Sequence, residues 1–250
     1  MVDRFNMYIC KALGGGLFFL MLLLVSPVLA QDVPDFSFLE ISEDANARYG
    51  PSADLLNGEK YYYPYLSAAG NPFFEVKGDQ DASLQIDGKL YENQKIRYDI
   101  YNQLMVLDYK DRSGAPGSIV LRNEWLDYLI IDGYQFKKYP DENGLEQFGQ
   151  VIHEGQFSCV YFWKKEYSPD FQQGEKTYRF SDPHLHSNIV VQEHFYPYSG
   201  KSKFLKCFPK QYQGKIKTYL KERRIRIRKV KNPEMKLLMV FINQLSDHED

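Results

Sequence analysis

Five glycine-containing pairs recur at short intervals through the middle of this sequence, and they constrain its fold more than any other feature. The pairs are Asn57-Gly58, Asp87-Gly88, Asp132-Gly133, Asn143-Gly144 and Glu154-Gly155. Asn-Gly and Asp-Gly adopt positive φ at low energetic cost, so they favour the tight turns of β-hairpins. The segments SLQIDGKLYEN and DYLIIDGYQFKKY are therefore predicted hairpins. Such short links predict an antiparallel meander, closed or half-closed, and not a parallel sheet with crossover helices.

The segments between these pairs have the composition and the period of strands. In KIRYDIY, apolar and polar side chains alternate: Ile96, Tyr98 and Ile100 on one face, Lys95, Arg97 and Asp99 on the other. This period of two predicts a sheet with one buried face and one solvated face. The run FSCVYFWKK is nearly all apolar, which predicts a central strand.

After Gly200 the period changes from two to that of an amphipathic helix. The apolar positions of the first stripe are Tyr212, Ile216, Tyr219 and Leu220, and those of the second are Met235, Leu238, Met239 and Ile242. Pro209 suits the first turn of one helix, and Asn232-Pro233-Glu234 is a start signal for the other. The predicted class is α+β, mainly β: an antiparallel meander sheet or partial barrel over 57–200, with a C-terminal helical hairpin over 201–250 packed on the sheet.

The first thirty residues have the pattern of a cleavable secretory signal. Arg4 and Lys11 accompany a long apolar run, and SPVLA ends at Ala30 with small residues where a signal peptidase cleaves. An uncleaved membrane anchor is the alternative, because the apolar run approaches spanning length. We expect 31–56 to be an extended or loop segment, and no later run is apolar enough to predict a transmembrane segment in the mature chain.

Charge is distributed very unevenly along the chain. Residues 31–200 contain 15 Lys and Arg against 27 Asp and Glu, whereas residues 201–232 contain 13 Lys and Arg against one Glu. An acidic body with a basic C-terminal segment indicates interaction with other molecules.

The basic character peaks in KERRIRIRKVKNPE, residues 221–234. The alternation from Arg224 to Arg228 predicts a short extended connector or edge strand, with Ile225 and Ile227 facing inward and the arginines in solvent. One interpretation is a solvated connector attracted to the protein's own acidic body. The other is an anion-binding patch for anionic lipid, lipopolysaccharide or an acidic envelope protein, because guanidinium groups pair well with phosphate and carboxylate. No nucleic-acid motif is present, so nucleic acid is not an expected partner. The candidate anion-binding residues are Arg223, Arg224, Arg226, Arg228, Lys229 and Lys231.

Two cysteines follow the predicted cleavage point. Cys159 and Cys207 could form a disulfide in an oxidising compartment, or remain as two buried thiols, and the sequence leaves both alternatives open. The segment DPHLHSNIVVQEH contains His184, His186 and His194, a chemically admissible zinc set. His-x-His alone is a weak signal, so we interpret these as exposed loop histidines and predict no metal and no cofactor.

No catalytic motif appears in the sequence. It has no G-x-S-x-G elbow, no H-E-x-x-H pair and no P-loop, and its scattered carboxylates define no glycosidase pair. The clusters YYYPY (61–65) and HFYPY (194–198) could stack on sugars, but aromatic side chains on strands more often pack in the core or across strands.

Three segments carry a resemblance. GEKYYYPYLSAAGNPFF, YENQKIRYDIYNQLMVLDY and FPKQYQGKIKTYLKERR are similar to segments of a group of uncharacterised exported proteins of Gram-negative bacteria. The resemblance implies export and a β-rich body with C-terminal helices, and it implies no activity and no functional residue. The predicted hairpins are also similar to the open, curved sheets of periplasmic lipoprotein carriers, a likeness of architecture alone.

These observations lead to a ranked set of functional hypotheses. The first is a non-enzymatic binding or envelope-associated module of unknown ligand, with its basic patch near an anionic surface. The alternatives are an envelope or glycan hydrolase, and a structural subunit of an exported assembly. We expect a periplasmic location, with secretion as the alternative.

Overall fold

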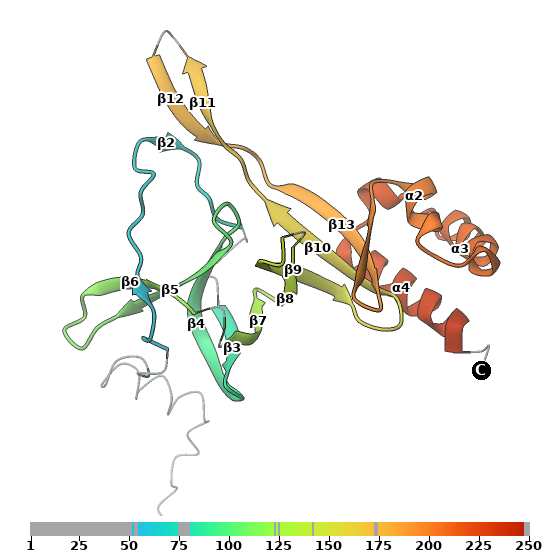
Figure 1. Ribbon diagram of the computed structural model, residues 1–250, viewed down its shortest axis with the longest axis horizontal. Coiled ribbons are helices and arrows are strands. Elements are labelled where there is room, and N and C mark those ends of the chain that lie inside the picture. Colours follow the sequence, from blue (N-terminus) through green and yellow to red (C-terminus); the bar gives the residue numbers. More distant parts are fainter. Residues whose placement is uncertain are drawn as a thin grey trace, which may run out of the picture. The chain divides into compact units, whose positions relative to one another are not determined.

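The computed structural model describes residues 52, 55–74, 81–122, 124, 126–141, 143–172 and 175–247 (Figure 1). The predicted signal segment lies outside these residues, as does nearly all of segment 31–56. The strands are β1 (Glu59–Lys60), β2 (Ala68–Ala69), β3 (Asp81–Ile86), β4 (Lys89–Asp99), β5 (Leu104–Lys110), β6 (Pro116–Val120), β7 (Leu126–Ile131), β8 (Tyr134–Pro140), β9 (Glu146–His153), β10 (Ser158–Lys164), β11 (Tyr167–Gln172), β12 (Glu175–Phe180), β13 (His184–Val191) and β14 (His194–Tyr198). The helices are α2 (Lys201–Lys206), α3 (Lys210–Glu222), the 3₁₀ turn η2 (Ile227–Lys229) and α4 (Asn232–Asp247).

Eleven strands form one open sheet. Their order is β1-β6-β5-β4-β3-β7-β8-β9-β10-β13-β14, and neighbouring strands run antiparallel. Two meanders, β3 to β6 and β7 to β10, meet where β7 pairs with β3. The predicted class, mainly β with an antiparallel meander sheet, is confirmed.

Two of the predicted hairpins have the predicted turn chemistry. Asp87 and Gly88 both have positive φ, 48° and 76°, in the turn between β3 and β4. Asp132 and Gly133 have the same values between β7 and β8. Two consecutive residues with positive φ make a type I′ turn, whose twist matches that of the flanking strands.

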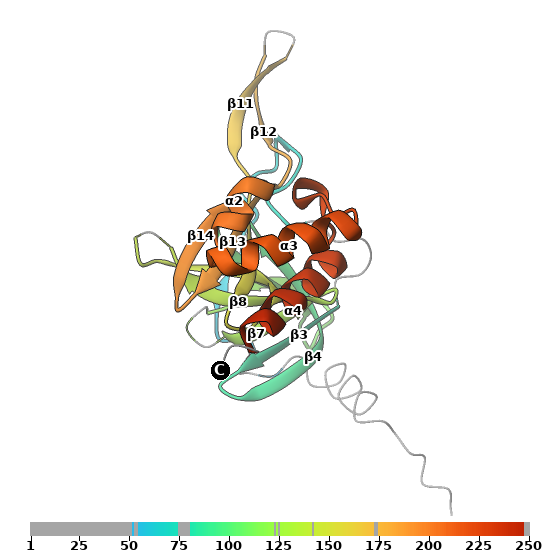
Figure 2. The ribbon, with the colours of Figure 1, turned by 90° about the vertical axis from the view of Figure 1, so that its right-hand side faces the viewer.

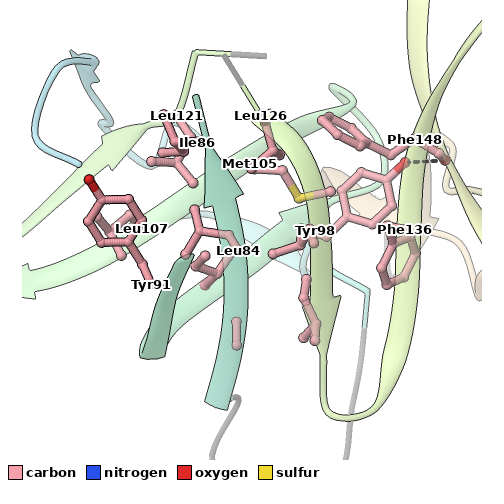
Figure 3. Close-up of a cluster of buried hydrophobic side chains, with 14 of the residues drawn as sticks. Leu84, Ile86, Tyr91, Tyr98, Met105, Leu107, Leu121, Leu126, Phe136 and Phe148 are labelled. Atoms are coloured by element: carbon pink, nitrogen blue, oxygen red, sulfur yellow. Dashed lines mark hydrogen bonds between the residues drawn. The ribbon is translucent and has the colours of Figure 1, made fainter. Parts of the chain in front are cut away.

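One core lies against β3 to β9 (Figure 3). Tyr98 and Phe136 are almost fully buried in it, and the Tyr98 hydroxyl donates to the carbonyl oxygen of Phe148 at 3.1 Å. The predicted inward residues of β4, Ile96 and Tyr98, are in this core as expected.

The prediction that one face of β4 is solvated is wrong at one position. Asp99 has no exposed surface, and its Oδ1 accepts the backbone N–H groups of Tyr101 and Asn102 at 3.0 and 2.8 Å. The carboxylate closes the turn after β4, and these hydrogen bonds offset the cost of burying it.

A second core lies between the other end of the sheet and the helices. Figures 1 and 2 show α2, α3 and α4 gathered beside β13 and β14. Tyr212, Ile216 and Leu220 of α3 are buried there, as are the predicted apolar positions of α4, Met235, Leu238, Met239 and Ile242. The third helix, α2, was not predicted, because six residues are too few to establish a helical period.

A small second sheet was also not predicted. It has the order β11-β12-β2 and includes a parallel pair between β12 and β2. Tyr65 of the YYYPY cluster packs its ring against Phe180 of β12 at a centroid distance of 4.9 Å. The packing interpretation of this cluster therefore holds for Tyr65, whereas Tyr62 is 71% exposed.

Candidate functional site

The basic segment after α3 is a capped helix end, and the predicted extended connector is wrong over most of its length. Arg224 has a left-handed backbone, with φ of 54°. The Ile225 N–H bonds to the carbonyl oxygen of Leu220 at 2.9 Å, and the Arg224 N–H to that of Lys221 at 3.2 Å. This pair of bonds is the Schellman motif that ends many helices, usually with glycine at the left-handed position.

The rest of the segment keeps part of the predicted pattern. Arg226 is extended, with φ −108° and ψ 106°, and η2 follows it. Ile227 is buried and Ile225 packs against the second core, so both isoleucines face inward as predicted. The six candidate anion-binding residues are exposed. The period of two from Arg224 to Arg228 therefore predicted correctly which side chains face inward. It predicted the wrong backbone conformation at Arg224 and in η2.

A groove of about 880 Å³ opens where this segment meets α2. Its apolar lining comes from Leu220, Ile225 and Ile227. Its basic lining residues are Lys201, Lys203, Lys221, Arg224, Arg226, Arg228 and Lys229. No carboxylate lines the groove, and none of the described carboxylates forms an ion pair with these seven side chains. We call this hollow the basic groove.

Arg228 is held in place at the groove wall. Its Nε donates to the carbonyl oxygen of Ser199 at 3.1 Å. A Cβ on Gly200 would lie 3.0 Å from the same Nε, so glycine leaves room for the guanidinium to approach the backbone. The terminal nitrogens of Arg228 bond to none of the described residues and remain available to an anion.

The basic groove contains some of the predicted residues and others that were missed. Arg223 is outside its lining, and its guanidinium lies over the Tyr219 ring, 5.5 Å from the centroid. Lys231 instead lines a separate hollow at the start of α4. Lys201, Lys203 and Lys221 belong to the same basic run in the sequence. Lys221 is at the end of α3, whereas only the packing of α2 beside that end brings Lys201 and Lys203 to Arg228.

The electrostatics of the basic groove favour an anionic occupant. Seven exposed cations with no carboxylate among them raise the local positive potential and repel one another. An anion in the groove would relieve that repulsion, and arginine forks and lysine ammonium groups can both donate hydrogen bonds to phosphate.

The histidines do not form a site. His184 and His186 pair with Lys164 and Phe162 across β10, whereas His194 pairs with Val191 at the far end of β13. Val191 is five positions along the strand from His186, about 16 Å at the usual rise. Within the described ranges, no group of three or more His, Cys, Asp or Glu side chains could hold a metal ion.

The two cysteines in the described part of the chain, Cys159 and Cys207, are free thiols. Cys159 is fully buried, with its Sγ 3.5 Å from the Tyr198 hydroxyl, and burial raises the pKa of its thiol to about 12. Burial also raises the pKa of Cys207 to about 11. The thiolate is the reactive form, so neither cysteine is suited to act as a nucleophile at neutral pH.

One hollow of about 500 Å³ contains two carboxylates, Asp141 and Glu193. Asp141 Oδ1 accepts the backbone N–H groups of Asn143 and Leu145, both at 2.8 Å. The Leu145 hydrogen bond is the main reason that the pKa of Asp141 is lowered. A carboxyl with a lowered pKa is a poor proton donor at neutral pH, so Asp141 is not suited to the acid role of a glycosidase pair.

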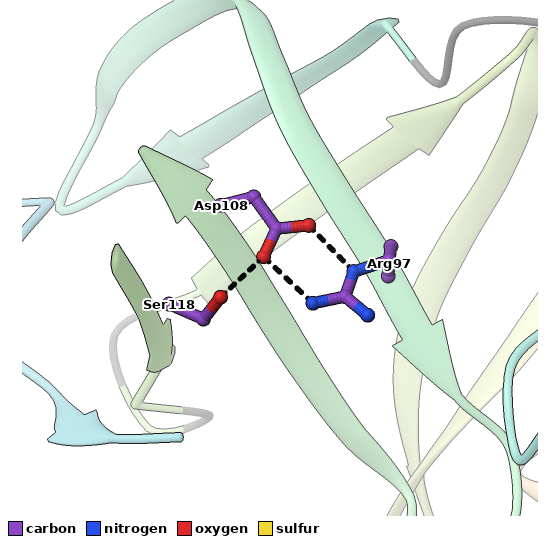
Figure 4. Close-up of polar contacts among 3 residues, drawn as sticks. All are labelled: Arg97, Asp108 and Ser118. Carbon is purple, nitrogen blue, oxygen red and sulfur yellow. Dashed lines mark hydrogen bonds and ion pairs between the residues drawn. The ribbon is translucent and has the colours of Figure 1, made fainter. Parts of the chain in front are cut away.

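A polar cluster on the first meander is structural (Figure 4). Asp108 receives two hydrogen bonds from Arg97, at 2.5 and 2.6 Å, and one from Ser118 at 2.5 Å. The guanidinium also lies over the Phe73 ring, 4.3 Å from its centroid. Arg97 of β4 and Ser118 of β6 both bond to Asp108 of β5, so the cluster links the three strands.

Comparison with known proteins finds no matching family model, no matching curated protein and no matching solved structure. None of the helices in the described part of the chain is long and apolar enough to cross a membrane.

Proposed function

We propose that this chain is an exported, non-enzymatic binding module that engages phosphate groups of anionic envelope lipids through the basic groove. One observation carries the proposal: seven exposed basic side chains from α2, α3 and the segment around η2 converge on one hollow that no carboxylate lines. The secretory pattern of residues 1–30 supports an envelope location, where such phosphates are abundant.

The structure of the groove favours recognition over general surface attraction. The Arg228 side chain is held by Ser199, so one of the cations has a fixed position before any ligand arrives, and the Schellman motif fixes the backbone from which the Arg224 side chain projects. Fixed donors lose less conformational entropy on binding than free side chains do.

The test is co-sedimentation of the mature chain with vesicles that contain anionic phospholipid, compared with vesicles of neutral phospholipid. We expect binding to the anionic vesicles alone, weakening as salt rises, because salt screens exposed charges. Replacing Arg224, Arg226 and Arg228 with Gln should weaken binding about a hundredfold, since each basic residue near an anionic surface contributes about 1 kcal/mol.

The matched control replaces Lys210, Lys215 and Lys217 with Gln. These lysines are exposed on α3 outside the groove, so the variant removes the same charge from the same basic segment. We expect it to weaken binding less than about fivefold. Equal losses in the two variants would show general attraction to the basic segment, and no binding by the parent chain would overturn the proposal.

A further inference from the structure

A smaller hollow adjoins the basic groove. Its volume is about 420 Å³. Ser199, Lys203, Ile227 and Arg228 line both hollows, so the two meet along a shared wall. An occupant of the basic groove can therefore extend into the smaller one.

The lining of the smaller hollow differs from that of the basic groove. Away from the shared wall, the side chains are Tyr161, Leu185, His186, Ser187, Pro197, Tyr198 and Val230. Tyr161 and Tyr198 stay neutral, because burial raises the pKa of both hydroxyls above the usual value. Leucine, proline, valine and two neutral rings give this wall apolar surface beside the polar side chains of His186 and Ser187, and its two cations, Lys203 and Arg228, lie on the side shared with the groove.

A cationic groove joined to a hollow with both apolar and polar side chains can contact both the headgroup and the hydrocarbon of an amphiphile. We propose that the two hollows together bind one phosphate-bearing lipid molecule, with its phosphate against Arg228 and its hydrocarbon chain over Leu185 and Val230. This inference rests on the proposed function and adds that the ligand is a single lipid molecule, held by headgroup and chain. The hydrocarbon gains free energy from leaving water, and the phosphate gains it from Arg228.

The experiment is calorimetric titration of the mature chain with three soluble probes: glycerol phosphate, a short-chain acylglycerol phosphate below its micelle concentration, and the matching acylglycerol without phosphate. We expect the acylglycerol phosphate to bind at least about tenfold more tightly than glycerol phosphate, because its chain leaves water. The probe without phosphate should bind more weakly than the acylglycerol phosphate.

Two single variants test where the hydrocarbon chain of the lipid lies. Leu185→Asn changes a residue of the smaller hollow that is 43% exposed, and Leu237→Asn changes a 59% exposed leucine of α4 outside both hollows. In Leu185→Asn, the ratio of the affinities for acylglycerol phosphate and glycerol phosphate should fall several-fold, and the affinity for glycerol phosphate should not change. Leu237→Asn should change neither.

The outcomes separate this inference from the proposed function. Equal affinity for glycerol phosphate and its acylated form would overturn the inference and leave the phosphate-binding groove in place. If Leu185→Asn still bound acylglycerol phosphate as much more tightly than glycerol phosphate as the parent does, the hydrocarbon chain would lie elsewhere, and the inference would also be overturned. Failure of both phosphate probes, together with failure to bind anionic vesicles, would overturn both.

Discussion

Arg224 occupies a backbone conformation that arginine rarely adopts. A left-handed residue other than glycine costs about 1–2 kcal/mol, because Cβ crowds the following carbonyl oxygen. Strained residues of this kind concentrate at binding and catalytic sites. In this chain the strained residue is also a cation of the basic groove, so function and stability place opposite demands on one position.

Replacing Arg224 with Gly should therefore stabilise the fold and weaken binding. We expect a gain of about 0.5–1 kcal/mol in the free energy of unfolding, because glycine adopts positive φ without strain at the end of a helix. Binding to anionic vesicles should weaken by about fivefold for the lost charge. Urea denaturation and vesicle co-sedimentation measure the two effects.

Arg226→Gly is the matched control. It removes another cation of the groove from a residue whose backbone is extended, where glycine relieves no strain and adds freedom to the unfolded chain. Binding should weaken as in Arg224→Gly, but stability should fall. If both variants were destabilised equally, the Schellman ending of α3 would be contradicted.

At the scale of elements, α4 is attached to the sheet by one side chain as well as by its apolar stripe. Asn243 Oδ1 accepts the backbone N–H of Phe157 at 2.9 Å, and its Nδ2 donates to the carbonyl oxygen of the same residue at 2.9 Å. The amide thus satisfies both backbone groups of Phe157, in the turn between β9 and β10, as a neighbouring strand would.

Asn243→Ala should lower the free energy of unfolding by about 2–3 kcal/mol, because it leaves a partly buried donor and acceptor unpaired. Gln244→Ala, at the exposed next position of the same helix, should change stability by less than about 0.5 kcal/mol. Chemical denaturation of both variants checks the difference. A loss in Asn243→Ala no larger than in Gln244→Ala would show that the apolar stripe alone holds α4.

At the scale of the whole molecule, two strands belong to both cores. Strand β9 contributes Phe148 to the first core and Ile152 to the second. Strand β10 contributes Cys159 and Tyr161 to the second core, and Trp163 packs against the first. All of the described residues also belong to one compact unit. The two cores should therefore unfold together.

We expect Leu129→Ala, in the first core, and Ile216→Ala, in the second, to shift the same transition. Both side chains are fully buried, so the free energy of unfolding should fall by about 2–5 kcal/mol in each variant. The helical signal in circular dichroism comes mainly from α3 and α4, which lie on the second core. Its urea midpoint should fall in both variants, and a midpoint that Leu129→Ala leaves unchanged would show two independent cores.

Features with a local physical cause could be predicted from the sequence alone. Asp87-Gly88 and Asp132-Gly133 encode their turns through the low cost of positive φ, and the stripes of α3 and α4 encode their buried faces through helical periodicity. The alternation in KIRYDIY predicted correctly that Ile96 and Tyr98 lie in the core, because the period of a strand is also a local property. The burial of Asp99 was missed because the period of two describes the strand alone, whereas the Asp99 carboxylate accepts the backbone N–H groups of the turn that follows β4.

The packing of whole elements determines where charge converges and where the histidines lie. The basic run was plain in the sequence, but its alternation gave no sign that Arg224 would end a helix. Lys201 and Lys203 join Arg228 because α2 packs beside the end of α3, and the register of β13 separates His194 from His186. Contacts between segments distant in sequence depend on how whole elements pack, and no local pattern records that packing.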